Sequence, residues 1–141
     1  MAELNFDTNL EEININGKVT VWLNLSDFEF ATKAAAAIQQ MGEIQEKCGE
    51  TISELTDIGE MFDTFRKADG EIREKIDGLF GMDVCTPLYG GMNVISYAEG
   101  TPVWCNLMFA LFDEIYTRMD EQQKKTLPRI DKYTAKYMKK K

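Results

Sequence analysis

The chain has 141 residues, of which 44% are hydrophobic and 28% charged, a composition typical of one globular domain with a single core. Its net charge is −8, and its longest uncharged apolar run, residues 101–112, is shorter than the ~20 residues that a membrane span needs. Residues 1–7 also lack the basic and then apolar pattern of a secretory signal, so we expect a protein of the cytoplasm with no membrane association.

The inventory of reactive residues argues against catalysis and metal binding. The chain has no histidine, the usual general base and metal ligand at neutral pH. Cys48, Cys85 and Cys105 form no close pair, which suits free thiols in a reducing compartment. Cys48 and Cys105 fall on apolar stripes, and Cys85 lies near the start of a short predicted helix with no identifiable base beside it. We therefore predict no enzymatic activity, no cofactor and no bound metal.

Charge is distributed unevenly along the chain. Residues 1–123 hold 8 Lys and Arg against 23 Asp and Glu, a net charge of −15, whereas residues 124–141 hold 8 against 1, a net charge of +7. A basic tail is a common feature of nucleic-acid-binding proteins, but this acidic body would repel phosphate. We expect a solvated, partly frayed tail that is able to fold back onto the acidic surface of its own chain, and we do not expect nucleic acid as a partner.

The first predicted element is a β-hairpin within residues 10–25. Two alternating segments flank Asn16-Gly17, a strong hairpin signal. A two-residue loop would spread apolar side chains over both faces, whereas a three-residue loop places Ile13 opposite Val19. We predict a three-residue loop, built on a type I turn with Gly17 in the left-handed region, and Trp22 on the face away from the core. The buried face would hold Val19, Val21, Leu23 and Leu25.

A helix is predicted to follow the hairpin, with Ser26 and Glu29 as a capping box at its start. Its apolar stripe is formed by Phe30, Ala34, Ile38, Met41 and Cys48. Gly49 weakens the helix, and Thr51 with Glu54 offers a second capping box. The helix therefore either breaks at Gly49 or continues through it with a bend.

The cleanest amphipathic pattern comes next and predicts a helix that faces the core. Its stripe is formed by Ile52, Leu55, Ile58, Phe62 and Phe65. Ala68-Asp69-Gly70 interrupts this pattern, and a further short helix is predicted from Ile72 to Phe80, ended by Gly81. A helical turn over residues 83–89 then precedes the glycine pair Gly90-Gly91.

The last predicted helix begins at Thr101, as N-cap, and Pro102, as first helical residue. Residues 103–112 are apolar around nearly the whole circumference, so we expect this helix to be buried. Leu127-Pro128 is expected to interrupt it. The predicted fold is mainly α: an N-terminal β-hairpin, then about four to five bundled helices with a buried C-terminal helix. Residues 1–128 form the predicted domain, and residues 129–141 a basic, frayed tail.

Four large aromatic residues are candidate protein-binding positions, because aromatic residues are frequent interface anchors. They are Trp22, Tyr97, Trp104 and Phe109. Core packing is the alternative role for Trp104 and Phe109.

Two segments of the chain resemble a known family. Residues 13–18, leading into Leu25-Ser26-Asp27, and the helix at residues 72–80, followed by residues 81–90, resemble the tail assembly chaperones of long-tailed phages and prophages of Gram-positive bacteria. The resemblance covers most of residues 10–119. The chain departs from the family pattern at Pro87, at Gly90-Gly91 and in its strongly apolar helix at residues 103–112.

The resemblance implies a non-enzymatic function in the cytoplasm of a bacterial host. Such a chaperone binds the tape measure protein, or another tail protein, during tail assembly. The lysine run Lys139-Lys140-Lys141 further suggests a slippery codon run that would yield a longer, frameshifted product. The alternative is a small helical adaptor protein that forms a homo-oligomer through its apolar helix. A third hypothesis, suggested only by the acidic body, is an inhibitor that mimics nucleic acid.

Overall fold

The computed structural model describes the backbone of residues 1–138 and the side-chain surroundings of residues 1–125. It confirms the mainly helical fold with an N-terminal β-hairpin. The elements, in order, are β1 (Glu11–Ile15), β2 (Val19–Leu23), α1 (Phe28–Ser53), α2 (Ile58–Phe80), α3 (Cys85–Tyr89), β3 (Tyr97–Ala98), β4 (Thr101–Pro102) and α4 (Val103–Met138).

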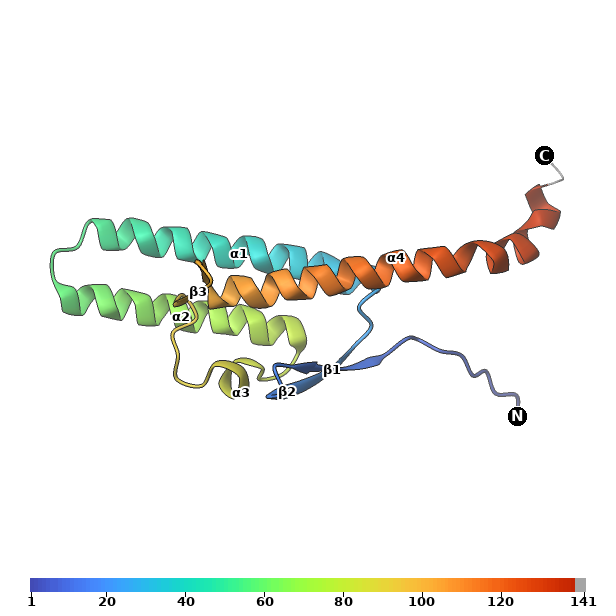
Figure 1. The fold of residues 1–141 in the computed structure, drawn as a ribbon, viewed down its shortest axis with the longest axis horizontal. Coiled ribbons are helices and arrows are strands. Elements are labelled where there is room, and N and C mark those ends of the chain that lie inside the picture. The colour runs from blue at the N-terminus through green and yellow to red at the C-terminus, as the bar shows by residue number, and fades with distance from the viewer. Residues whose placement is uncertain (139–141) are drawn as a thin grey trace.

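Three long helices lie side by side and define the shape of the molecule (Figure 1). Helices α1 and α2 form an antiparallel hairpin, and α4 runs lengthwise beside them. The β1–β2 hairpin and α3 lie on the side of α2 and α4 that is opposite to α1, and residues 1–10 lead to β1 as an extended arm. Beyond the start of α1, α4 continues away from the other elements.

One hydrophobic core joins these elements. Its buried residues are Val19, Val21, Leu25, Phe30, Ala34, Ala37, Met41, Cys48, Ala68, Ile72, Ile76, Val84, Cys85, Leu88, Val94, Ile95, Trp104, Met108, Leu111 and Ile115. On α4 the buried positions follow a spacing of four, three and four residues, so this helix faces the core with one stripe. The prediction of a buried C-terminal helix is confirmed for this stripe, whereas Phe109, on another side of the helix, is 49% exposed in the single chain.

The β1–β2 hairpin has the predicted loop length and the predicted faces, but a different register. Ile15 pairs with Val19 and Ile13 with Val21, so the loop is Asn16-Gly17-Lys18 and the register is shifted by two residues. Side chains alternate with a period of two, and this shift therefore leaves the buried face unchanged. Asn16 and Gly17 both have positive φ, and the Lys18 amide donates to the Ile15 carbonyl at 3.0 Å. This pattern is typical of a type I′ turn and corrects the type I prediction.

The start of α1 corrects the predicted capping box by one residue. Asp27, not Ser26, is the N-cap, and its carboxylate accepts from the Glu29 amide at 2.9 Å. Ser26 instead donates, through both its amide and its hydroxyl, to the side chain of Asn24. The helix then continues through Gly49 to Ser53. The second predicted capping box is absent because the Thr51 hydroxyl donates to the Lys47 carbonyl within the helix.

Helix α2 corrects two further predictions. It runs without interruption through residues 68–70, because Ala68 is a contact point in the core and the packing of this face outweighs the ~1 kcal/mol that a helical glycine costs. The stripe predicted from Ile52 to Phe65 is divided by a chain reversal at residues 54–57, which leaves Ile58 and Phe62 exposed. Gly81 ends the helix in the left-handed region, as predicted.

Helix α4 begins later and ends later than predicted. Thr101 and Pro102 form β4, and the first helical amides, of Val103 and Trp104, donate to the carbonyls of Ser96 and Val94 at 2.8 and 3.2 Å. Loop carbonyls thus replace the predicted Thr101 cap. The helix continues through Pro128 to Met138, since a proline removes one amide donor without having to end a helix. Residues 139–141, including the lysine run, lie outside the described residues.

Candidate protein-binding surface

An apolar cavity of about 180 Å³ lies between the β1–β2 hairpin and α4. It is lined by Ile13, Asn14, Ile15, Asn16, Leu23, Leu25, Phe80, Leu107, Ala110, Leu111 and Glu114. Hairpin side chains form one wall and α4 forms the other. Because most of these side chains are aliphatic, the cavity suits an apolar side chain better than a polar ligand.

A second cavity, of about 380 Å³, adjoins the first along α4. Its lining comes from the hairpin loop, α3, the following loop and α4: Ile15, Asn16, Lys18, Leu88, Tyr89, Met92, Ala98, Val103, Asn106, Leu107 and Ala110. The two cavities share Ile15, Asn16, Leu107 and Ala110. They therefore form one surface, which we call the hairpin groove.

Polar contacts hold the walls of the hairpin groove in place. At one end, Arg118 Nε of α4 donates to Glu11 Oε2 of β1 at 2.9 Å, which ties the first strand to the helix. At the other end, the Tyr89 hydroxyl donates to the Val103 carbonyl at 3.0 Å. Burial is the main cause that raises the pKa of Tyr89 well above its ordinary value, so this hydroxyl stays a donor at neutral pH.

The loop that carries Met92 into the hairpin groove is fixed to α2 by Arg73. The guanidinium Nη2 donates to the carbonyls of Gly90 and Met92 at 2.8 and 2.6 Å, and Nε donates to Asp69 Oδ1 at 3.1 Å. The same carboxylate oxygen accepts from the Val94 amide at 2.8 Å. One ion pair on α2 thus anchors both ends of residues 90–94.

The start of α3 is fixed to α2 in the same way. Asp77 Oδ1 accepts from the amides of Val84 and Cys85 at 2.9 and 3.0 Å, in the manner of an N-cap supplied by another helix. This contact places Leu88 and Tyr89 against the hairpin groove. No local sequence signal identifies Asp77 in this role, because it lies seven residues before the amide it caps.

The four aromatic residues predicted to bind a partner do not form one site. Trp22 and Tyr97 are 63% and 69% exposed, on β2 and β3. Trp104 is 4% exposed, and its Nε1 donates to Gln45 Oε1 at 2.6 Å, so it belongs to the core, the alternative that we had left open. Phe109 is half-exposed on α4. None of the four lines the hairpin groove.

Sequence reasoning missed the α4 residues that do line the hairpin groove, Leu107 and Ala110. The sequence did indicate that the hairpin contacts a helix, because a lone two-stranded hairpin is marginally stable in water and must pack on another element. The face of α4 that the hairpin covers could not be chosen, since residues 103–112 are apolar on every side.

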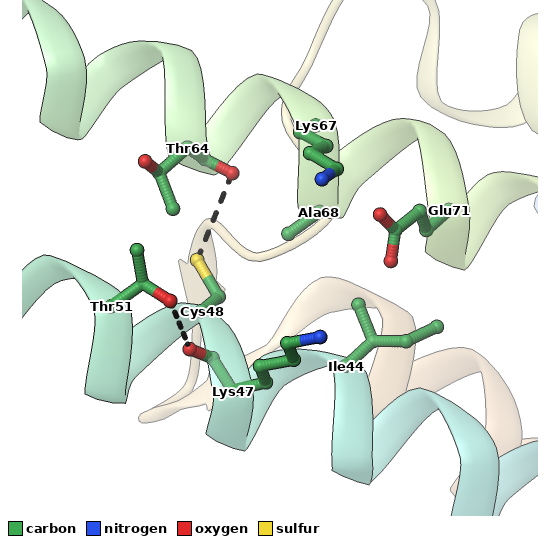
Figure 2. Close-up of a pocket in the computed structure, with 8 residues that line it drawn as sticks. All are labelled: Ile44, Lys47, Cys48, Thr51, Thr64, Lys67, Ala68 and Glu71. Atoms are coloured by element: carbon green, nitrogen blue, oxygen red, sulfur yellow. Dashed lines mark hydrogen bonds between the residues drawn. The ribbon is translucent and has the colours of Figure 1, made fainter.

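A further cavity, also of about 180 Å³, lies between α1 and α2, and a cysteine lines it (Figure 2). Cys48 on α1 points toward α2, and its Sγ lies 3.9 Å from the Thr64 carbonyl oxygen. Burial, and then the charge of Glu71, raise the pKa of this thiol above its ordinary value. A protonated thiol is a poor nucleophile, so burial disfavours Cys48 as a nucleophile at neutral pH.

The three free thiols should differ in reactivity. Burial, and then the hydrogen bond and charge of Asp77, raise the pKa of the Cys85 thiol strongly, whereas Cys105 is partly exposed and its pKa is raised by burial alone. A raised pKa lowers the thiolate fraction at a given pH, and the thiolate is the reacting species. We predict that at pH 8 a disulfide reagent modifies Cys85 at least ~10-fold more slowly than Cys105. Peptide mass spectrometry against time measures both rates.

Unfolding in urea is the control for this prediction, because it should bring the two rates together. In the folded protein both rates should rise as the pH is raised from 7 to 9, since neither pKa has then been passed. Equal rates for Cys85 and Cys105 in the folded protein would contradict the prediction.

Among the residues whose side chains the structure describes, no group of three or more Cys, Asp or Glu is arranged to hold a metal ion. No helix in that part of the chain combines the length and the apolar character needed to cross a membrane. Compared with known proteins, the chain matches no family model, and no curated protein or solved structure shows a significant match to it.

Proposed function

We propose that the protein is a non-enzymatic tail assembly chaperone, which binds the tape measure protein in the cytoplasm of a bacterial host during phage or prophage tail assembly. The observation that carries the binding role is the hairpin groove, an apolar surface bounded by α4, the β1–β2 hairpin and the loop after α3. The resemblance of residues 13–27 and 72–90 to tail assembly chaperones supports the identity of the client.

The hairpin groove suits a helical client. Its two cavities follow one another along α4, and aliphatic side chains line both of them. An amphipathic helix presents apolar side chains at intervals of three and four residues and can insert them successively into such a surface. Lys18, Asn106 and Glu114 on the lining provide polar contacts that would set the orientation of the client. Tape measure proteins, as long helical proteins, offer segments of this kind.

Ala110→Arg tests whether the hairpin groove binds the client. Ala110 lies in both cavities but is itself exposed, so the arginine can leave the fold intact while it places a charge among aliphatic side chains. We expect the wild-type protein to co-purify with the co-expressed tape measure protein and to keep it soluble. For the variant we expect an affinity at least ~10-fold lower, measured by calorimetry with a client fragment.

Ala36→Arg is the matched control, because Ala36 is an exposed alanine of α1, away from the hairpin groove. It should bind the client like the wild-type protein. Equal binding by the two variants would exclude the hairpin groove as the client site. Failure of the wild-type protein to bind or solubilise the tape measure protein would overturn the chaperone proposal and favour the adaptor alternative.

A further inference from the structure

The C-terminal half of α4 projects from the body of the protein. Among residues 103–125 of this helix, Ile115 is the last buried residue and Met119 is partly buried, and the helical backbone continues to Met138. At 1.5 Å per residue, the part beyond Met119 is roughly 28 Å long. Residues 120–125, the last whose side chains are described, are exposed apart from Gln122, so α4 leaves the body of the protein here.

This projection also separates the two charge regions of the chain. The basic segment, residues 124–141 with a net charge of +7, begins on α4 beyond the body, whose residues 1–123 carry −15. Because α4 is continuous to Met138, residues 124–138 cannot fold back on the acidic body of their own chain, which corrects the expectation from the sequence. A second copy of the chain, however, offers the same acidic surface without that constraint.

An exposed row of aromatic side chains marks where two copies would meet. Phe109, Phe112 and Tyr116 share one face of α4, at intervals of three and four residues. Phe109 is 49% and Tyr116 78% exposed, and Phe112 is partly buried. We call these three residues the aromatic stripe. It lies at the point where α4 leaves the body, and large exposed aromatic side chains are common interface anchors.

An antiparallel pairing of two α4 helices brings opposite charges together. If two copies are paired so that residue 109 of one lies opposite residue 116 of the other, Lys124 lies opposite residue 101, about one helical turn beyond the level of Trp104. The hydrogen bond from Trp104 to Gln45 shows that α1 lies beside α4 at this level. The exposed residues of α1 here include three acids, Glu43, Glu46 and Glu50, and one cation, Lys47, so the face keeps a negative net charge. The basic segment of each copy would therefore lie along an acidic face of the other.

We propose that the protein forms a two-fold symmetric, antiparallel homodimer through the aromatic stripe, with the basic segment of each α4 lying on the acidic face of the partner's α1. Symmetry makes each charge contact occur twice, once in each direction, and closes the assembly at two copies. The dimer involves no client and leaves the hairpin groove, on another face of α4, open to solvent.

A charge exchange tests the proposed pairing. Lys124→Glu with Lys125→Glu reverses the start of the basic segment, and Glu46→Lys with Glu50→Lys reverses the acidic face; all four side chains are exposed. We expect a wild-type dimer in sedimentation equilibrium at 0.1 M salt, and at least ~10-fold weaker dimerisation for each double variant. Carrying all four substitutions in one chain should restore the dimer, because opposite charges again face each other.

Lys67→Glu with Lys75→Glu on α2 is the matched control, and it should dimerise like the wild-type protein. A wild-type monomer at 100 µM and low salt would overturn the proposal. The proposal would also be overturned if the Lys124→Glu/Lys125→Glu variant dimerised as well as the wild-type protein. The same holds if the variant with all four substitutions failed to recover dimerisation. These measurements use the chain alone, so their outcome is independent of client binding.

Disulfide cross-linking tests the direction of the pairing. On a Cys105→Ser background, an antiparallel pair places position 109 of one copy opposite position 116 of the other. We therefore expect a mixture of Phe109→Cys and Tyr116→Cys chains to cross-link between the two variants faster than either variant cross-links to itself. Preferential self-linking of Phe109→Cys would indicate a parallel pair and contradict the proposal.

Discussion

Trp104→Ala should lower the free energy of unfolding by about 3–5 kcal/mol, the cost of a large truncation in a well-packed core. Trp104 lies on the first turn of α4, is 4% exposed, and donates from Nε1 to Gln45 of α1 at 2.6 Å. The truncation leaves a cavity between α1 and α4 and removes the partner of the Gln45 side chain. Urea denaturation followed by circular dichroism measures the loss, which for a chain of this size is roughly 10 °C or more in Tm.

Two variants separate the parts of this effect. Trp104→Phe keeps most of the apolar volume and loses the hydrogen bond, so we expect a loss of about 1–2 kcal/mol. Trp22→Ala removes the same side chain from a position that is 63% exposed and should cost less than about 1 kcal/mol. If Trp22→Ala and Trp104→Ala were equally stable, Trp104 would not be the core residue that the structure describes.

Local patterns in the sequence predicted which helices and strands form better than they predicted the register of the strands or the first and last residues of the helices. The alternation on either side of Asn16-Gly17 identified the hairpin and its buried face because both depend on a period of two, which a shift of two residues preserves. The exact register required the conformation of Asn16, whose positive φ selects a different turn. Similarly, the apolar spacing of α1 was correct, but the choice between Ser26 and Asp27 as N-cap depended on Asn24, which binds Ser26.

The wrong predictions for the helices have one cause: tertiary packing outweighs the local conformational preference of single residues. Gly49 and Gly70 suggested breaks, but both lie inside long helices whose opposite faces are buried. Conversely, Ile58 and Phe62 continue an apolar stripe in the sequence, but the chain reverses just before them. As a result their side chains face solvent. A single sequence shows the apolar stripe and the glycines, but it does not show which helix faces pack against each other.

The sequence predicted exposed aromatic side chains but not the lining of the candidate surface. Trp22 and Tyr97 were correctly placed outside the core, whereas a binding function rather than catalysis stays a prediction from the lack of histidine and the scattered cysteines. The hairpin groove itself depends on long-range contacts such as Glu11 with Arg118, which are separated by 107 residues. No local pattern contains that information, so the lining of the groove could be found only from the fold.

Arg73→Ala should lower the free energy of unfolding by about 2–3 kcal/mol and weaken client binding as well. The guanidinium makes three hydrogen bonds, to Asp69 and to the carbonyls of Gly90 and Met92, and its side chain is only 20% exposed. Its removal leaves a partly buried carboxylate without its cation and frees the loop whose Met92 lines the hairpin groove. Urea denaturation measures the stability, and hydrogen exchange at residues 90–94 measures the release of the loop.

Arg73→Lys shows whether geometry or charge is responsible. A lysine keeps the positive charge but cannot reach Asp69 and two carbonyls at once, so we expect it to recover less than half of the loss. Arg66→Ala is the matched control, because Arg66 is 80% exposed and lies 3.6 Å from Asp63 in a surface pair on the same helix. Such a pair contributes little, so this variant should stay within about 0.5 kcal/mol of the wild-type protein. Equal stability of Arg73→Ala and Arg66→Ala would show that the other contacts of the loop, such as the hydrogen bond from Asn93 to the Phe65 carbonyl, are sufficient to hold it, and that Arg73 does not shape the groove.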